Sequence, residues 1–251
     1  MSSHSTSQII GNPFIQLVEV DSTNNYAMAQ IHNGLAKHGS TWFTLSQTAG
    51  KGQRGKQWKA FNGMNILQTT VLNADAFNLA YPFILTALAA NACYDFFSEY
   101  AGDETSIKWP NDIYWRDRKA GGILIENIIR GNTWMWSLVG IGININQTEF
   151  DNLPNPVSLK QITGKTYDAT ELGKSLCSYM DKHYHQYLSE GSAGAFELYN
   201  KHLFKKDKVA KLRKGDKEFT CTIKGVSENG DLLVENCNWE KFSFGEIEWI
   251  I

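Results

Sequence analysis

The chain of 251 residues lacks several features that would assign it to a class at once. It has no apolar run near the roughly 20 residues needed to span a bilayer. Its polar start, residues 2–8, has neither the charged nor the apolar region of a signal peptide. The four cysteines form no Cys-x-x-Cys pair and lie near no histidine pair with zinc-like spacing. We therefore expect a soluble, cytoplasmic protein with reduced thiols and no membrane partner.

The sequence also has no excess of charge of either sign, because it contains 24 basic and 26 acidic residues. A net charge of -2 gives no global attraction to nucleic acid, so any basic site must be local. His183 and His185 stand two apart on an expected helix and cannot share one face, and we assign no metal-ligating residues. The 42% of hydrophobic residues suffices for a sizeable core, in one large domain or one with a small appendage.

The apolar pattern alternates between strands and helices. Helical patterns cover residues 25–31 and 79–100, and Asp168 with Glu171 resembles a capping box for a third helix. Strand-like segments rich in β-branched residues are separated by turn signals: 14–20, 41–47, 65–72, 112–115, 121–129 and 133–145. Together these segments predict an α+β fold, with a mixed, largely antiparallel sheet packed with helices.

Beyond residue 204 the pattern changes to short alternating strands. Turn signals at 214–216 and 229–231 suit a small β-barrel of about 45 residues. We therefore predict two domains, residues 1–204 and 205–251.

The basic glycine-rich loop Gly50–Lys56 is the first candidate for a binding site. Its three glycines let backbone N–H groups approach an anion, and Lys51, Arg54 and Lys56 supply positive charge. The loop lacks the Gly-Lys-Ser/Thr ending of a Walker motif, and a flexible surface turn is the competing interpretation. Trp58 follows closely, where its ring would either stack on an adenine or belong to the core.

Three further motifs carry candidate ligand-binding residues. Pro110 makes the segment Lys108–Asp112 rigid at the end of a strand, although a plain turn would look the same. Lys119 precedes two glycines that would let a ligand approach the backbone; the alternative is a solvated lysine. The segment Gly140–Asn146 alternates small or polar residues with isoleucines, which suits either a strand with one ligand-facing side or a bulged core strand.

In order and spacing, these motifs closely resemble the catalytic domain of biotin–protein ligases. The resemblance spans Asp21 to Asn146, and the C-terminal barrel, SH3-like in this family, adds a weaker match. Five motifs carry it: Ser22-Thr23-Asn24, Gln47 to Trp58, Lys108–Asp112, Lys119 with Gly121–Glu126, and Gly140–Asn146.

The resemblance implies an enzyme that joins biotin to ATP as biotinyl-5'-AMP. It then passes biotin to a lysine of a biotin carboxyl carrier protein, of the acetyl-CoA carboxylase type. Lys119, Lys51 and Mg2+ would neutralise the carboxylate and the phosphate, and Asp112 would orient or deprotonate the incoming lysine. The resemblance also implies a wider ligand-binding set: Ser22, Thr23 and Gln47 on the polar ring of biotin, Gly122 in its pocket, Arg54 and Lys56 on the phosphates, Trp58, Asn111 and Asn144 near the nucleotide, and Asn24, Gly50, Gly52, Gln53 and Ile143 as further binding residues.

Gln53 departs from the family pattern, because an arginine often stands there and helps to retain the acyl-adenylate. Only about twenty residues precede Asp21, too few for the helix-turn-helix domain that some members carry, so we expect no DNA binding. Members often pair through sheet edges, which leaves a homodimer open. The competing functions are a lipoate– or octanoate–protein ligase and a non-catalytic biotin- or nucleotide-sensing module.

Overall fold

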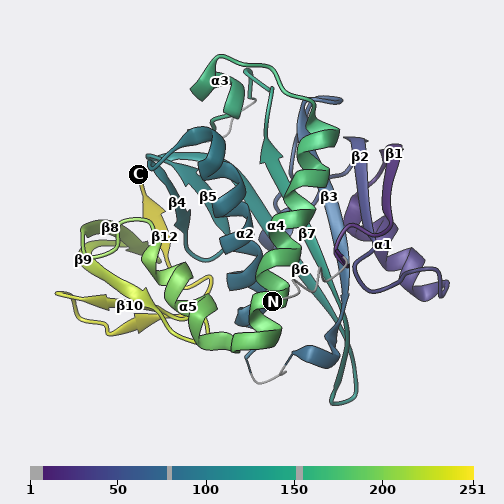
Figure 1. Ribbon diagram of the computed structural model, residues 1–251. Coiled ribbons are helices and arrows are strands. Elements are labelled where there is room, and N and C mark those ends of the chain that lie inside the picture. The colour runs from purple at the N-terminus through teal and green to yellow at the C-terminus, as the bar shows by residue number, and fades with distance from the viewer. Residues whose placement is uncertain (1–7, 78–80, 151–154) are drawn as a thin grey trace, which may run out of the picture.

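A seven-stranded β-sheet is the larger of the two sheets in the computed structural model (Figure 1). The structure describes residues 8–77, 81–150 and 155–251. Only β1 and β2 run parallel; the other neighbouring strands are antiparallel. The α+β class expected from the sequence is therefore confirmed. In spatial order the seven strands are β1 Phe14–Val20, β2 Thr41–Gln47, β3 Asn65–Asn73, β7 Thr133–Asn144, β6 Arg118–Arg130, β5 Asp112–Trp115 and β4 Thr105–Lys108.

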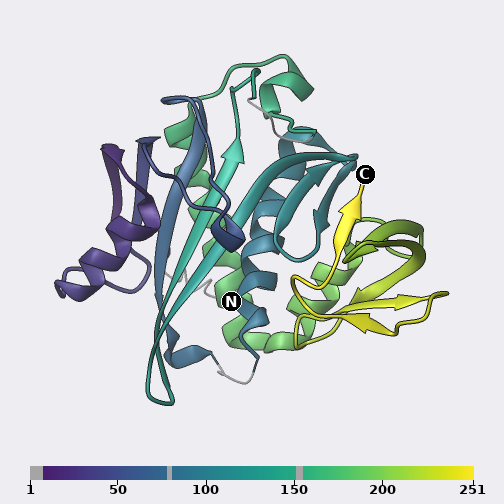
Figure 2. The same cartoon turned by 180° about the vertical axis from the view of Figure 1, so that it is seen from behind.

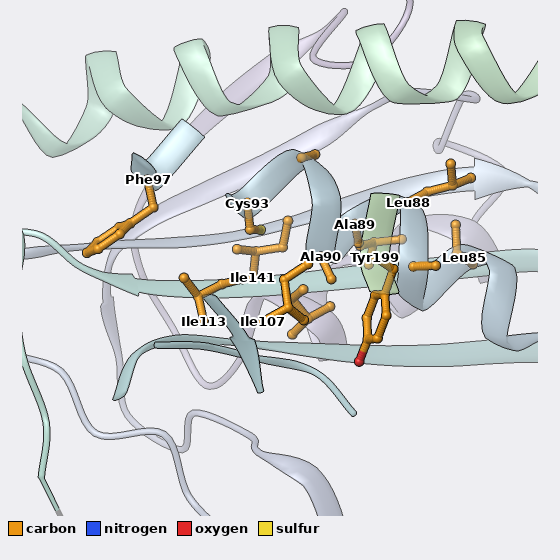
Figure 3. Packing of buried hydrophobic residues seen from close by; sticks show 14 of the residues in the cluster. Leu85, Leu88, Ala89, Ala90, Cys93, Phe97, Ile107, Ile113, Ile141 and Tyr199 are labelled. Carbon is orange, nitrogen blue, oxygen red and sulfur yellow. The ribbon is translucent and has the colours of Figure 1, made fainter. Parts of the chain in front are cut away.

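Helices cover both faces of this sheet (Figures 1 and 2). Helix α1, Thr23–His32, packs over β2, β3 and β7 on one face, while α4, Ala169–Glu190, and the central α2, Phe83–Ala101, cover the other. Because β3 is covered from both sides, eight of its nine residues are buried. Figure 3 shows the main core, where α2 packs against isoleucines of the sheet.

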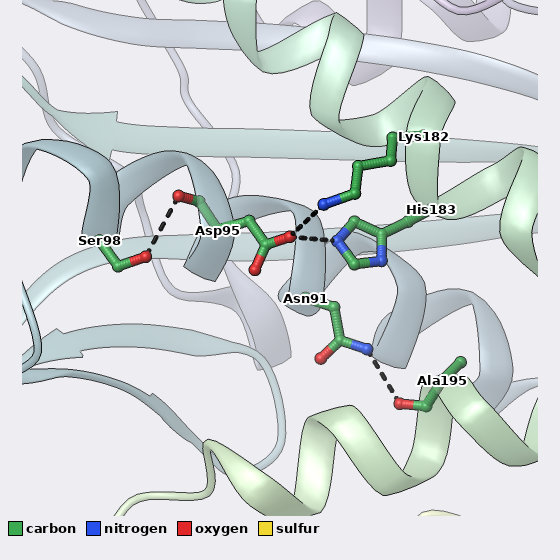
Figure 4. A network of polar contacts seen from close by, with 6 residues as sticks. All are labelled: Asn91, Asp95, Ser98, Lys182, His183 and Ala195. Carbon is green, nitrogen blue, oxygen red and sulfur yellow. Dashed lines mark hydrogen bonds and ion pairs between the residues drawn. The ribbon is translucent and has the colours of Figure 1, made fainter.

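A partly buried network of polar contacts joins α2 to α4 (Figure 4). The ring of His183 is 3% exposed, and its Nε2 lies 2.9 Å from Asp95 Oδ2. Lys182 Nζ reaches the same oxygen at 3.2 Å. Asn91 on α2 donates to the carbonyl of Ala195, at 2.9 Å. This network fixes the helix layer against which the sheet is built.

Several expected helix ends are corrected by the structure. Helix α2 begins at Phe83, after Pro82, rather than at Leu79, which itself lies outside the described residues. Asp168 caps α4 by accepting from two backbone N–H groups, but the expected capping box is wrong, because Glu171 pairs with Lys174 at 2.7 Å instead. The helices α3, Leu159–Thr163, and α5, Ser192–Lys201, have no counterpart in the sequence prediction; α3 begins at a reciprocal capping box that Ser158 forms with Gln161.

The C-terminal strands form a separate five-stranded sheet, in agreement with the expected small β unit. Trp109 Nε1 donates to the carbonyl of Gly230 at 2.8 Å, which ties this sheet to the larger one. The domain boundary at residue 205 stays a prediction. Among the described residues, no helix is both long and apolar enough to cross a membrane. The strands, in spatial order, are β11 Lys241–Phe242, β10 Leu232–Glu235, β9 Lys217–Val226, β8 Val209–Lys214 and β12 Glu248–Ile250.

Candidate active site

A cavity of about 900 Å³ lies between the large sheet, the loop after β2 and the C-terminal strand β12. The loop after β2, which supplies part of its lining, crosses the face of the sheet opposite α2 and α4 (Figure 2). Ligand pockets of roughly 300–1,000 Å³ are typical for small molecules, so this cavity has room for a nucleotide and a second small ligand.

Most of the site residues predicted from the sequence line the wall of this cavity. The two exceptions lie behind the wall. Ile143 is fully buried in the core, and Gly50 packs against the backbone of Trp58, where an added Cβ would lie 2.4 Å from the carbonyl oxygen. The predicted residues that line the cavity are Ser22, Thr23, Asn24, Gln47, Lys51, Gly52, Gln53, Arg54, Lys56, Trp58, Asn111, Asp112, Lys119, Gly122 and Asn144.

The basic loop is a compact hairpin rather than a loose turn. An isolated bridge joins Lys51 to Gln57, and the N–H of Gly52 donates to the carbonyl of Lys56 at 2.7 Å. A short 3₁₀ turn, Gln53–Gly55, forms its tip. Arg54 in this tip donates to the carbonyl of Gly245 at 3.3 Å, so the loop reaches the C-terminal sheet. The backbone of the loop is thereby placed along one side of the cavity.

The indole of Trp58 lies in the cavity wall against two glycines of the sheet. A Cβ on Gly142 would fall 2.6 Å from its Cε2, and one on Gly122 would lie 3.4 Å from its Cζ3. The Nε1 atom is buried without a hydrogen-bond partner among the described residues. Gly142 is therefore needed to admit the ring, whereas a Cβ on Gly122 would meet it at an ordinary van der Waals distance. The ring itself borders the space for a ligand.

Lys119 and Asp112 form the closest ion pair in this wall. Lys119 Nζ lies 2.6 Å from Asp112 Oδ1, and the two side chains are 34% and 18% exposed. They stand on neighbouring strands, where a register shift at Ile113 and Tyr114 interrupts the ladder. Asn144 Nδ2 donates to the carbonyl of Lys119, at 3.4 Å, and so supports the backbone of this lysine. In this pair each charge neutralises the other.

Lys108 is a further cation at the cavity that the sequence motif contained but to which no role was assigned. Its Nζ lies 4.9 Å from the ring centre of Tyr114 and 5.6 Å from that of Trp249. Burial lowers the pKa of Lys108 to about 8, although Asp112 opposes the shift and Lys119 and Lys56 add to it. This amine is thus far easier to deprotonate than an exposed lysine.

The floor of the cavity is a buried hydrogen-bond network. The N–H and hydroxyl of Thr23 lie 2.8 and 3.2 Å from Gln47 Oε1. Thr69 Oγ1 lies 2.8 Å from the hydroxyl of Thr23 and 2.6 Å from Asn24 Oδ1. Thr69 was not predicted, because a threonine within a β-branched run looks like any other strand residue.

Two other contributions were missed. Glu126, inside a recognised motif, pairs with Lys51 at 3.5 Å. The C-terminal segment closes one side of the cavity through Phe244, Gly245, Ile247, Glu248, Trp249 and Ile251. No local pattern indicates that this segment folds back onto the loop.

Comparisons with known proteins find sequences similar to this chain. The Biotin/lipoate A/B protein ligase family matches residues 17–144. The bifunctional ligase/repressor BirA of Bacillus spizizenii is 28% identical over 233 residues, covering 91% of this chain and 71% of that protein. The biotin--[acetyl-CoA-carboxylase] ligase of Paracoccus denitrificans is 35% identical over 164 residues, 62% of this chain and 66% of that protein.

Solved structures match the fold over almost the whole chain. The biotin protein ligase of Aquifex aeolicus in complex with biotin and ATP has a TM-score of 0.77 at 24% identity, covering 94% of this chain and 98% of that one. A biotin protein ligase of Leishmania major in complex with biotinyl-5-AMP has a TM-score of 0.65 at 22% identity, covering 92% and 98%. With the family match spanning residues 17–144, the chain belongs to the biotin/lipoate A/B protein ligase family.

Proposed function

We propose that this protein is a biotin–protein ligase that forms biotinyl-5'-AMP from biotin and ATP. It then transfers biotin to a lysine of a biotin carrier domain of the acetyl-CoA carboxylase type. The observation that carries the proposal is the single cavity that joins a buried polar floor to the cations Lys51 and Lys119. The Paracoccus relative is named for this reaction, and the Aquifex structure is described with both biotin and ATP.

The floor around Thr23 and Gln47 is the subsite that we assign to the polar ring of biotin. Ser22 and Thr23 are 2% and 4% exposed, and Gln47 accepts from the N–H and hydroxyl of Thr23, which fixes the polar atoms of Thr23. A substrate that fails to satisfy such buried polar groups loses binding free energy, because those groups are left unpaired. This favours a ureido ring over the plain alkyl chain of octanoate.

In the first step the biotin carboxylate attacks the α-phosphorus of ATP and pyrophosphate leaves. Two anions must approach each other, so Lys119 and Lys51 would offset the charge on the carboxylate and the α-phosphate. Arg54 and Lys56 would hold the other phosphates, and Trp58 would border the adenosine. The wall suits this step because all five side chains line it.

Magnesium fits this wall as an ion carried by the phosphates. Of the described residues that line the cavity, three bear carboxylates, namely Asp112, Asp117 and Glu248. A nucleotide-bound magnesium ion needs only one or two of these, and Asp112 already pairs with Lys119. Asp117 and Glu248 are the remaining carboxylates that would hold the ion, which would offset phosphate charge.

In the second step the carrier lysine attacks the carbonyl carbon of the acyl-adenylate and AMP leaves. Lys119 would stabilise the developing negative charge on the carbonyl oxygen. Asp112, which lies beside it, would orient the attacking amine and accept its proton. Once Lys119 turns toward the anionic intermediate, Asp112 becomes available for this role.

The first step is tested by incubating the protein with magnesium, ATP labelled in the α-phosphate and one acid at a time. Biotin should give labelled acyl-adenylate and an equal amount of pyrophosphate, whereas lipoate and octanoate should give little. An adenylate formed with lipoate or octanoate in preference to biotin would assign the protein to the lipoate branch. No adenylate with any acid, from folded protein, would refute the enzyme and favour a sensing module.

A further inference from the structure

Glu126 on β6 is an acidic side chain whose two carboxylate oxygens have different partners. Its Oε1 lies 3.5 Å from Lys51 Nζ on the basic loop. Its Oε2 accepts a hydrogen bond from Asn24 Nδ2, at 2.7 Å. Glu126 itself is not among the described residues that line the cavity, but both partners are. It therefore reaches the cavity only through Lys51 and Asn24.

Asn24 offers Glu126 a rigid attachment. This side chain is buried, at 3% exposed, and its Oδ1 lies 2.6 Å from the hydroxyl of Thr69. A Cβ on Gly140 would lie only 2.2 Å from Oδ1, so the amide is packed tightly against the sheet. With Oδ1 held toward Thr69, Nδ2 must point to Glu126. The carboxylate of Glu126 is thus held in one place by a buried partner.

Lys51 is the mobile member of the pair. Its side chain is 40% exposed and lies on the loop, and a lysine has a flexible four-carbon stem. The ammonium has three donors, so the contact with Glu126 leaves others for a ligand. The fixed carboxylate of Glu126 therefore restricts the position of the Lys51 ammonium and leaves donors of that ammonium available to a ligand.

We propose that Glu126 is a positioning residue for the acid substrate: held by Asn24, it keeps Lys51 at the cavity wall where the carboxylate of the acid binds. This inference rests on the proposed function, because it takes biotin as the acid. The same pair could act in the opposite sense if Glu126 masked Lys51 from the substrate. The two roles differ in the sign of one measurable change.

The test is the variant Glu126→Gln, which keeps an acceptor for Asn24 and removes the charge that faces Lys51. Binding of biotin, and of the primary alcohol in which its carboxylate is reduced to CH2OH, is measured by calorimetry. Because partly exposed ion pairs are weak, we expect biotin to bind about two- to fivefold more weakly. The alcohol should bind as it does to the wild type, since it has no carboxylate for Lys51 to meet.

Two further variants isolate the cause. Glu104→Gln removes an exposed carboxylate that pairs with Arg116 at the end of the sheet, and it should leave the binding of both ligands unchanged. If Glu126 acts through Lys51, then adding Glu126→Gln to Lys51→Gln should cause no additional loss of biotin affinity. An additional loss equal to that in the wild-type background would overturn the proposal.

Three other results would also overturn it. Tighter biotin binding by Glu126→Gln would mean that Glu126 masks Lys51, equal weakening of biotin and the alcohol would mean a general structural role, and unchanged binding of biotin would mean no role. A wild-type protein that binds neither ligand would instead refute the proposed function itself.

Discussion

Replacement of Lys119 by methionine should nearly abolish formation of the acyl-adenylate. Methionine keeps much of the length of the stem but removes the charge that we assign to the carboxylate and the α-phosphate. Loss of one such preorganised donor typically lowers the rate about 100- to 1,000-fold, or about 3–4 kcal/mol in activation free energy. The substitution also removes the ion pair that Lys119 makes with Asp112 at 2.6 Å. Because both side chains are partly exposed, this loss should lower the free energy of unfolding by only about 1 kcal/mol.

Asp112→Asn is the matched variant. The Lys119 ammonium can still donate to the asparagine oxygen, so adenylate formation should stay within about tenfold of wild type, whereas transfer to a carrier lysine should fall about 100-fold or more. Rapid quench with labelled ATP measures the first step, and mixing preformed adenylate with carrier measures the second. If folded Lys119→Met forms the adenylate within tenfold of the wild-type rate, the assigned role of Lys119 is wrong.

Three other changes have distinct expected results. Gln53→Arg should slow release of free acyl-adenylate, as measured by quenched-flow chromatography, and equal leakage from both proteins would count against this. Gly142→Ala would place a Cβ 2.6 Å from the Trp58 ring, so it should weaken ATP binding and cost about 1–3 kcal/mol in stability. Gly194→Ala, whose Cβ would meet nothing closer than 3.8 Å, is the control. If Gly142→Ala and Gly194→Ala bind ATP equally well in a nucleotide titration, the packing of Trp58 against Gly142 does not shape the nucleotide site. Burial lowers the pKa of Lys108 to about 8. Between pH 8 and about 10.5 the Lys108 amine is therefore protonated in the unfolded chain and largely neutral in the folded one. The free energy of unfolding of the wild type should rise with pH in this range, by up to about 1.4 kcal/mol per pH unit. Lys108→Met should remove this rise in urea unfolding, and parallel curves for the two proteins would contradict the buried amine.

Strands with clear local signals were predicted well. The limits of β1, β2 and β5 agree with the expected segments to the residue, because each is a short β-branched or aromatic run between turn signals. The helices α3 and α5 were missed, since one is very short and the other begins in a serine- and glycine-rich segment with little apolar periodicity. The order of the strands depends on tertiary packing, which no local pattern contains.

The candidate site divides in the same way. Residue types with chemical meaning, such as Lys119 and Asp112, were predicted from their motifs, and the fold brings these two together. The link from Asn24 through Glu126 to Lys51 includes a contact between residues 102 apart in the sequence, so it requires the register of the sheet. Contacts from the C-terminal strand likewise depend on how the second sheet packs on the first.

The central claim is tested most directly by mass spectrometry of an apo biotin carrier domain. The carrier is incubated with the protein, ATP, magnesium and biotin, and parallel reactions omit one component or replace biotin with lipoate. We predict a mass increment equal to one biotinyl group on a single carrier lysine, dependent on both ATP and biotin. An unmodified carrier in the presence of folded protein, or a lipoyl increment in place of a biotinyl one, would contradict the assignment.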